Sequence, residues 1–268
     1  MIRLYTRDLF VGYDEKCIIN NLSVEIPNKK ITAIIGANGC GKSTLLKAMT
    51  RIISAQSGSI ILDGKDIASE HTKTLARKMA ILPQTPESAN GLTVCELVYF
   101  GRFPYQKGFG NPTKRDCEVI DWALDVTGTK EFKHRTLDAL SGGQRQRVWI
   151  AMALAQETDI IFLDEPTTYL DLTHQLEVLE LLQKLNHEQE RTIVMVLHDL
   201  NQAARFADHM IALKDGEIVK TGNVFDVINH EVLENVFNID AEIGIDPRTL
   251  KPMCVTYNLL QPKSIQTI

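Results

Sequence analysis

One stretch decides the fold of this chain: Ile31-Thr32-Ala33-Ile34-Ile35-Gly36-Ala37-Asn38-Gly39-Cys40-Gly41-Lys42-Ser43-Thr44. It begins as a short apolar run, passes through a glycine-rich turn and continues from Lys42 with a helical pattern. The turn satisfies the pattern G-x-x-x-x-G-K-[ST] at every fixed position, and this pattern binds phosphate where a strand precedes it and a helix follows it. The sequence therefore predicts a strand, a phosphate-binding loop and a helix, in that order.

The predicted loop has the chemistry of a nucleotide site. Glycines let the backbone curl so that successive N–H groups point at phosphate oxygens, and the start of the helix adds its dipole. In this pattern Lys42 reaches the outer phosphates and the hydroxyl of Ser43 ligates Mg²⁺. The alternative, a glycine-rich turn with an accidental lysine, does not explain the flanking strand and helix. We therefore predict that a nucleotide contacts nine residues: Gly36, Ala37, Asn38, Gly39, Cys40, Gly41, Lys42, Ser43 and Thr44.

Two further apolar runs, Ile160–Leu163 and Ile193–Leu197, have the length of buried strands. Between them leucines recur at helical spacing, at positions 172, 176, 179, 182 and 185. Continuous apolar strands that alternate with amphipathic helices predict an α/β fold with a mostly parallel sheet covered on both faces. A ligand of such a sheet lies beyond the carboxyl ends of its strands. We therefore expect the polar residues that follow the strands to converge on one site.

Four polar residues follow predicted strands in this way. Asp164 and Glu165 end the run from Ile160, and we expect Asp164 to hold the Mg²⁺ hydration shell while Glu165 polarises the attacking water. His198 follows the run from Ile193 and is a candidate sensor of the γ-phosphate. Gln84 follows the short strand expected at 79–82 and is assigned to catalysis and to the metal. Each has a plainer alternative as a solvated or hydrogen-bonded polar residue.

A second anion site is predicted at Leu140-Ser141-Gly142-Gly143-Gln144, which opens a helix expected over Arg145–Gln156. The free N–H groups of a helix start attract phosphate. The chain thus carries two phosphate-binding helix starts, and one nucleotide in one domain needs only one of them. Two copies arranged head to tail would resolve this, each copy contributing Ser141, Gly143 and Gln144 to the nucleotide of its partner.

In this order the segments resemble the ATPase domains of ABC transporters, and the likeness runs from about Leu4 to Thr221. The elements of that family are Walker A, Q-loop, signature, Walker B and H-switch, matched respectively by Gly36–Thr44, Gln84, Leu140–Gln144, Ile160–Glu165 and His198. The resemblance implies ATP and Mg²⁺ as cofactors. It also implies that Tyr13 stacks on adenine and that Leu170-Asp171 is the D-loop, with Asp171 at the dimer interface. Tyr13 has the alternative of a buried strand aromatic.

Within the family, Gly101–Tyr105 and Pro166–Leu172 resemble ATPases that serve importers of iron–siderophore, haem and cobalamin type. The sequence at Gln106–Gly110 looks closest to the ferric-hydroxamate (ferrichrome) branch of Gram-positive bacteria. This resemblance implies a second ATPase subunit, transmembrane permease subunits and, indirectly, an extracellular substrate-binding protein. The chain would then sit at the cytoplasmic face of the membrane, bound through its permeases.

The composition agrees with an ATPase subunit that has no membrane span of its own and no affinity for nucleic acid. The net charge of −5 and the pI near 5.8 give no general attraction to nucleic acid. No apolar run approaches the roughly 20 residues that span a bilayer, and the five cysteines form no metal-binding pair. We expect an ATPase domain over 1–222, with antiparallel strands near its start and a helical subdomain inserted at about 86–157. A C-terminal extension over 223–268 would pack on the core.

Two other functions stay open at this point. One is a nucleic-acid-handling ABC ATPase, although such proteins insert heptad arms or zinc modules before the signature and this segment is compact. The other is a soluble ABC ATPase used in cofactor assembly, without a membrane partner. Two hypotheses on single sites follow as well. Cys40 would be a reactive thiolate beside Lys42, and a groove lined by Pro86–Gly91 and Tyr99–Tyr105, with Arg102 and Tyr105 as anchors, would bind the permease.

Overall fold

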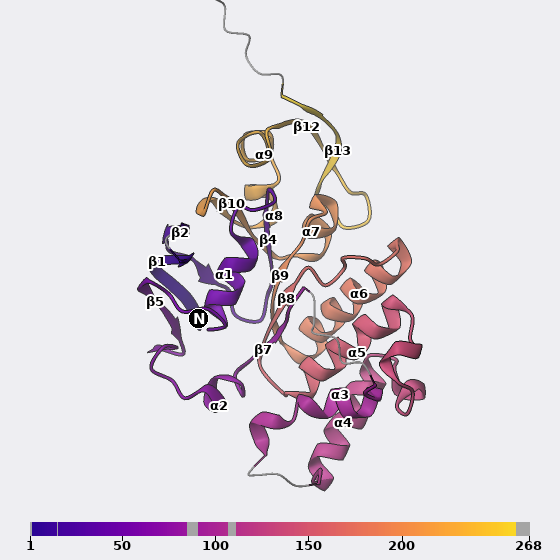
Figure 1. The fold of residues 1–268 in the computed structure, drawn as a ribbon. Coiled ribbons are helices and arrows are strands. Elements are labelled where there is room, and N and C mark those ends of the chain that lie inside the picture. The colour runs from indigo at the N-terminus through magenta and orange to yellow at the C-terminus, as the bar shows by residue number, and fades with distance from the viewer. Residues whose placement is uncertain (1, 15, 85–90, 107–110, 261–268) are drawn as a thin grey trace, which may run out of the picture.

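The structure is a computed structural model that describes residues 2–14, 16–84, 91–106 and 111–260. At its centre lies a six-stranded sheet (Figure 1), in which β10 and β11 pair antiparallel and all other neighbours pair parallel. The strand order is β11 (Glu217–Gly222), β10 (His209–Lys214), β4 (Ile31–Gly36), β9 (Thr192–Val196), β8 (Ile160–Asp164) and β7 (Met79–Leu82). The predicted mostly parallel sheet is confirmed.

Strand β4 shows why the sheet is covered on both faces. Its side chains alternate, so that Ile34 packs in one buried cluster while Ala33 and Ile35 pack in the other. Helix α1 (Lys42–Met49) contributes to the first cluster, and α6 (Leu172–Gln189) and α7 (Leu200–Phe206) contribute to the second. In Figure 1 these helices accordingly lie on opposite sides of the sheet.

The antiparallel strands predicted near the start form a second sheet, which packs with α1 around the first cluster. Its order is β2-β1-β5-β6, with β3 paired to β1. The elements are β1 (Leu4–Tyr13), β2 (Lys16–Leu22), β3 (Glu25–Ile26), β5 (Ser57–Leu62) and β6 (Lys65–Asp66), and the short helix α2 (Thr72–Leu75) follows.

A lobe of helices lies between β7 and β8 in sequence, and it consists of α3 (Val94–Phe100), α4 (Lys114–Val126) and α5 (Gly142–Ala155). Three single turns of 3-10 helix accompany it, at Phe103–Tyr105, Lys130–Phe132 and Leu137–Ala139. The helix expected over Arg145–Gln156 is present as α5, but it begins three residues earlier, at Gly142. Ser141 caps α5 together with Gln144, so Gly142 and Gly143 already form the first turn.

Arg102 corrects the expected permease-binding surface. Its side chain is buried, with ion pairs to Asp116 (Nε–Oδ1, 2.8 Å) and Glu157 (Nη1–Oε2, 2.7 Å), and it donates to the carbonyl of Ala155. The hydroxyl of Tyr105 donates to the carbonyl of Gln156 at 3.0 Å. Both residues therefore hold the lobe together, and their assignment as exposed anchors is wrong. Residues 86–90, which make up most of the other wall expected for the groove, lie outside the described residues. So do residues 107–110 of the segment that resembles the ferric-hydroxamate branch.

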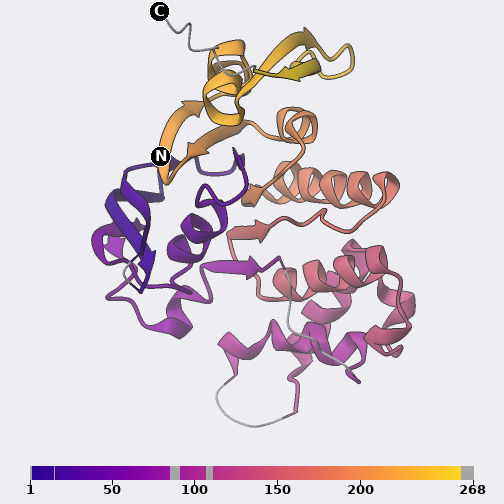
Figure 2. The ribbon, with the colours of Figure 1, turned by 45° about the horizontal axis from the view of Figure 1, so that its top comes forward.

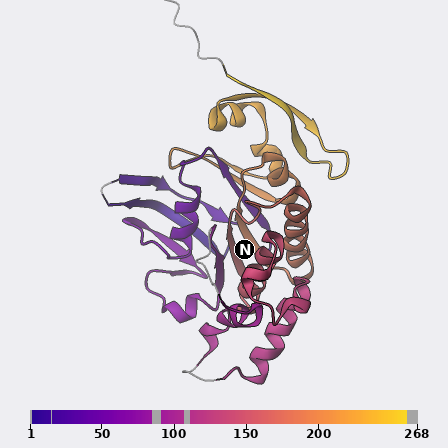
Figure 3. The ribbon, with the colours of Figure 1, turned by 45° about the vertical axis from the view of Figure 1, so that its right-hand side comes forward.

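The C-terminal part consists of α8 (Val224–Val227), α9 (His230–Phe237), β12 (Ile239–Ile245) and β13 (Pro252–Leu259). Helices α8 and α9 are separate because Asn229 leaves helical geometry and caps α9. The β12–β13 hairpin is fastened to α7: Asn201 exchanges two hydrogen bonds with the backbone of Cys254, and Lys251 donates to the carbonyls of Arg205 and Ala207. Figures 2 and 3 show the hairpin at the end of the molecule opposite the helical lobe.

Across the described residues, the structure contains no helix with both the length and the apolar character needed to cross a bilayer.

Candidate active site

A cavity of about 430 Å³ lies beyond the carboxyl ends of β4, β8 and β9. It is lined almost entirely by residues that the sequence singles out. These are Tyr13, Asn38, Gly39, Gly41, Lys42, Ser43, Thr44, Gln84, Glu165 and His198, with Ile18 in addition. Residues from both sheets and from the end of β7 therefore meet at one place, as the parallel topology predicts.

The loop before α1 has the geometry of an anion site. Gly41 has a φ of 108°, and a Cβ there would lie 2.8 Å from the side chain of Ile19, so only glycine fits. Helix α1 begins at Lys42 without a side-chain cap, which leaves its first N–H groups free for a ligand. The ammonium of Lys42 donates to the carbonyls of Gly36 and Ala37, at 2.9 Å each.

Ser43 and Asp164 face each other below this loop. The hydroxyl of Ser43 donates to the Asp164 carboxylate at 2.8 Å, and Asp164 is buried. Burial raises the pKa of Asp164, while the Ser43 hydrogen bond opposes that shift. A hydroxyl and a carboxylate are the hard oxygen donors that Mg²⁺ prefers, and Mg²⁺ usually takes only one or two protein groups beside substrate phosphates. The pair therefore fits the predicted metal.

Glu165 is held by three donors. His198 Nε2 lies 2.5 Å from one carboxylate oxygen, while Gln84 and Thr168 (Oγ1, 3.0 Å) donate to the other. The backbone of Glu165 has a φ of 54°, in the left-handed region that is uncommon for residues other than glycine. These contacts fix the carboxylate of Glu165 beside the cavity that Lys42 also lines. Thr168 is missing from the sequence-based site, and its position three residues after Glu165 is the only signal that could have indicated it.

Tyr13 and Cys40 lie in opposite surroundings. Tyr13 ends β1, is 45% exposed and lines the cavity, so the alternative of a buried strand aromatic is wrong. Cys40 is 4% exposed and packs against Gly36, where a Cβ would lie 2.6 Å from its sulfur. Burial raises the pKa of the Cys40 thiol more than Lys42 lowers it. The expectation of a reactive thiolate is therefore wrong.

The second anion site lies apart from this cavity. Ser141 and Gln144 cap the start of α5 reciprocally, while Gly143 packs under the ring of His174, where a Cβ would approach to 2.2 Å. The His174 ring in turn contacts Asp171, with 2.8 Å between Nδ1 and Oδ1. Asp171 caps α6 and its side chain is exposed. His174, which the sequence did not indicate, therefore joins the predicted signature to the predicted D-loop within one chain.

Comparison with known proteins agrees with this geometry. A family model described as "ABC transporter" matches residues 19–168. The chain is 57% identical over 261 residues to the iron(3+)-hydroxamate import ATP-binding protein of Bacillus subtilis, with 97% of each chain covered. The chain belongs to the ABC transporter family.

Other members of the ABC transporter family match over most of their length. A petrobactin import ATP-binding protein of Bacillus anthracis is 50% identical over 254 residues, which cover 95% of this chain and 93% of that protein. A metal-chelate type ABC transporter solved in an inward-facing conformation superposes with a TM-score of 0.82 at 29% identity, covering 95% of this chain and 96% of the other. A dimeric bacterial ABC transporter cassette gives a TM-score of 0.72 at 29% identity, covering 82% and 98%.

From these matches, the chain is the ATP-binding and ATP-hydrolysing component of an ABC system. The predicted α/β cassette fold is confirmed.

Proposed function

We propose that this chain hydrolyses ATP to power the import of ferric siderophores, most specifically of the hydroxamate type. The convergence of Lys42, Ser43 and Glu165 on one cavity carries the catalytic part of the proposal, with Asp164 hydrogen-bonded to Ser43. The names of the relatives carry the cargo, since both are import ATP-binding proteins and the more similar one is named for iron(3+)-hydroxamate.

The residues that line the cavity support the following catalytic roles. The phosphate loop and Lys42 hold the outer phosphates, and Ser43, Asp164 and Gln84 hold Mg²⁺. When bound, Mg²⁺ neutralises charge that develops on the phosphates. Glu165 orients the attacking water, and His198, which contacts its carboxylate, senses the γ-phosphate. Tyr13 stacks on adenine at the open side of the cavity, where its ring is exposed.

The assembly we propose is a head-to-tail dimer, which the dimeric cassette of similar fold supports. Ser141, Gly143 and Gln144 then complete the partner's nucleotide site, and the exposed Asp171 crosses the interface. Transmembrane permeases bind the dimer at the cytoplasmic face of the membrane, with an extracellular substrate-binding protein acting indirectly. We divide the chain into an ATPase domain at 1–222, with a helical subdomain at about 86–157, and an extension at 223–268.

The two alternative functions gain no support. Both relatives are named as import ATP-binding proteins, which favours a membrane partner over a soluble assembly ATPase. The acidic net charge of −5 gives no attraction to nucleic acid.

Substitution of Glu165 tests the catalytic part. Glu165→Gln keeps the shape of the side chain, removes the charge that orients water and replaces one acceptor oxygen by an NH₂ group. We expect ATP binding to be retained while turnover falls by roughly 10²–10⁴-fold. Glu188→Gln, on the exposed face of α6, is the matched control. Turnover by Glu165→Gln at the rate of this control would contradict the assignment.

Uptake of radiolabelled iron tests the cargo. A strain that lacks this protein should take up no ferric hydroxamate siderophore, and the wild-type chain, but not Glu165→Gln, should restore uptake. Uptake of ferric citrate in the same strain is the control. Unchanged hydroxamate uptake in the deletion strain would remove the cargo assignment and leave the ATPase intact.

A further inference from the structure

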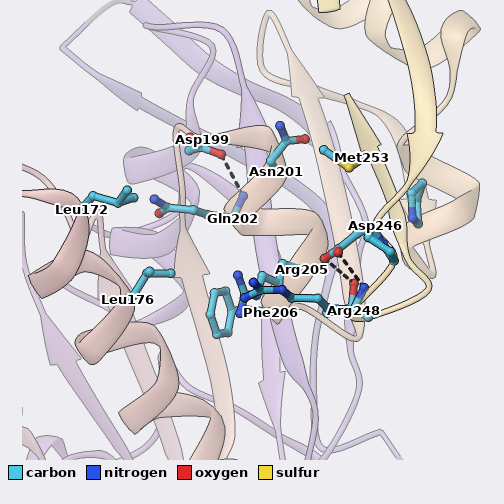
Figure 4. Close-up of a pocket in the computed structure, with 13 residues that line it drawn as sticks. Leu172, Leu176, Asp199, Asn201, Gln202, Arg205, Phe206, Asp246, Arg248 and Met253 are labelled. Carbon is cyan, nitrogen blue, oxygen red and sulfur yellow. Dashed lines mark hydrogen bonds between the residues drawn. The ribbon is translucent and has the colours of Figure 1, made fainter. Parts of the chain in front are cut away.

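Two glutamines join the D-loop to the helix that follows His198. The side-chain amide of Gln175, in the first turn of α6, donates to the carbonyl of Leu170 at 2.9 Å. Its oxygen accepts a hydrogen bond from the side chain of Gln202 in the first turn of α7, at 2.6 Å. Figure 4 shows Gln202 extending from α7 toward α6, between Leu172 and Leu176.

The chemistry of the Leu170 carbonyl fixes the direction of this bridge. A carbonyl can only accept, so Gln175 must present its NH₂ group to Leu170. That orientation leaves the oxygen of Gln175 for Gln202. Both glutamine side chains are partly buried, so an amide that lost its partner would lose a hydrogen bond that water does not freely replace.

The bridge closes a ring of contacts through Glu165. On one side the chain runs from Glu165 through Thr168, which donates to the Glu165 carboxylate, to Leu170. On the other side the backbone N–H of Gln202 donates to Asp199 at 2.8 Å (Figure 4), and Asp199 directly follows His198. His198 returns to the Glu165 carboxylate. A displacement of the D-loop at Leu170 is therefore passed to the position of His198.

We propose that the Gln175–Gln202 bridge is a positioning device that sets His198 against Glu165 according to the position of the D-loop. The two glutamines do not touch the reacting atoms and act through His198. This inference rests on the catalytic roles proposed for Glu165 and His198. In the head-to-tail dimer the D-loop lies at the subunit interface, so the bridge makes hydrolysis respond to closure of the partner subunit.

Steady-state ATP hydrolysis by the full chain tests the bridge. Gln175→Leu and Gln202→Leu preserve size and remove the hydrogen bonds. We expect each to lower kcat by about 10-fold, because each breaks the link between Leu170 and α7, with KM for ATP within about twofold of wild type. The double variant should be no slower than Gln175→Leu, because both substitutions break one bridge. Gln183→Leu, two turns further along α6, is the matched control and should keep the wild-type kcat.

A second background separates positioning from a general structural effect. In a His198→Ala chain, adding Gln202→Leu should change kcat no further, because the residue through which the bridge acts is already absent. A further drop there, or a wild-type kcat for Gln202→Leu alone, would overturn the proposal. Thermal melting identifies a variant that fails to fold. If Gln175→Leu fails to fold, the kcat of Gln202→Leu alone tests the proposal. Wild-type turnover by Glu165→Gln would instead overturn the proposed function, which keeps the two failures distinct.

Discussion

Cys40 has a side chain that is 4% exposed, and its sulfur lies where a side chain at Gly36 would otherwise be. The sequence places it beside Lys42 at a helix start, a setting that usually favours the thiolate. Burial opposes this and raises the pKa of the thiol. The local sequence shows the neighbouring charge but not the depth of the side chain, so only the structure decides between the two effects.

Alkylation by iodoacetamide should therefore reach Cys40 only after the exposed cysteines. Because its pKa is raised, the fraction of thiolate at any given pH is lower than in an ordinary cysteine, and labelling should become measurable only as the pH is increased. The exposed Cys17 and Cys117 should react first at pH 8. Mass spectrometry after timed labelling gives the order. Modification of Cys40 before Cys117 would contradict the shielding.

Gly143 should tolerate no side chain. A Cβ there would come within 2.2 Å of the His174 ring, which Asp171 holds in place, so Gly143→Ala should destabilise the fold by about 1–3 kcal/mol. Gly142→Ala is the control, since its Cβ would meet Leu170 at an ordinary 3.9 Å. Removing the ring with His174→Ala should restore most of the melting temperature. A double variant as unstable as Gly143→Ala would exclude the clash as the cause.

At the scale of the element, the turn after α3 shows where a sequence pattern misleads. Arg102, Phe103 and Tyr105 surround a proline in a segment without helical periodicity, which favours an exposed loop. The structure exposes only Phe103, at 51%, and directs Arg102 into the junction between α3, α4 and the end of α5. Its carboxylate partner Asp116 lies 14 residues away. In the local sequence Asp116 reads only as a capping residue of α4, with Thr113.

Breaking this junction should cost stability. Arg102→Met keeps the aliphatic stem but leaves the buried Asp116 without its ion pair, and we expect a loss of about 3–5 kcal/mol in the free energy of unfolding. Arg115→Met removes an exposed pair to Glu157 and should cost at most about 1 kcal/mol. Urea denaturation of both variants measures the difference. Equal stabilities would show that Arg102 does not hold the lobe.

Elements with continuous local patterns could be predicted, and contacts between elements could not. The apolar runs that form β4, β8 and β9 are visible in the sequence, and the parallel topology brings Asp164, Glu165 and His198 together at one edge. The contact of His174 with Gly143 and the Gln175–Gln202 bridge depend instead on how α5, α6 and α7 pack against one another. No spacing along the chain encodes those contacts, so these residues become visible only in the folded molecule.

At the scale of the whole molecule, the two anion sites lie on different parts of one subunit, and the head-to-tail dimer that we propose would combine them. We therefore expect Glu165→Gln to be monomeric without nucleotide and to dimerise with ATP, because uncleaved triphosphates join the Lys42 loop of one copy to Ser141 of the other. Sedimentation velocity with and without ATP measures this, and ADP is the control. A dimer that persists without nucleotide would contradict the sandwich.

Because the C-terminal hairpin is fastened to α7, the effects of C-terminal truncations on function need careful interpretation. Asn201 and the Gln202 that reaches α6 are neighbours in the first turn of α7, and the hairpin contacts that turn through Cys254 and the end of α7 through Lys251. Removing β13 and the residues after it would loosen α7, the helix that follows His198. A loss of uptake in such a truncated protein would therefore reflect damage to the hydrolytic site. Surface replacements such as Tyr257→Ser, at a side chain 62% exposed, spare those anchors. They give geneticists a cleaner way to map what this end of the subunit does in the cell.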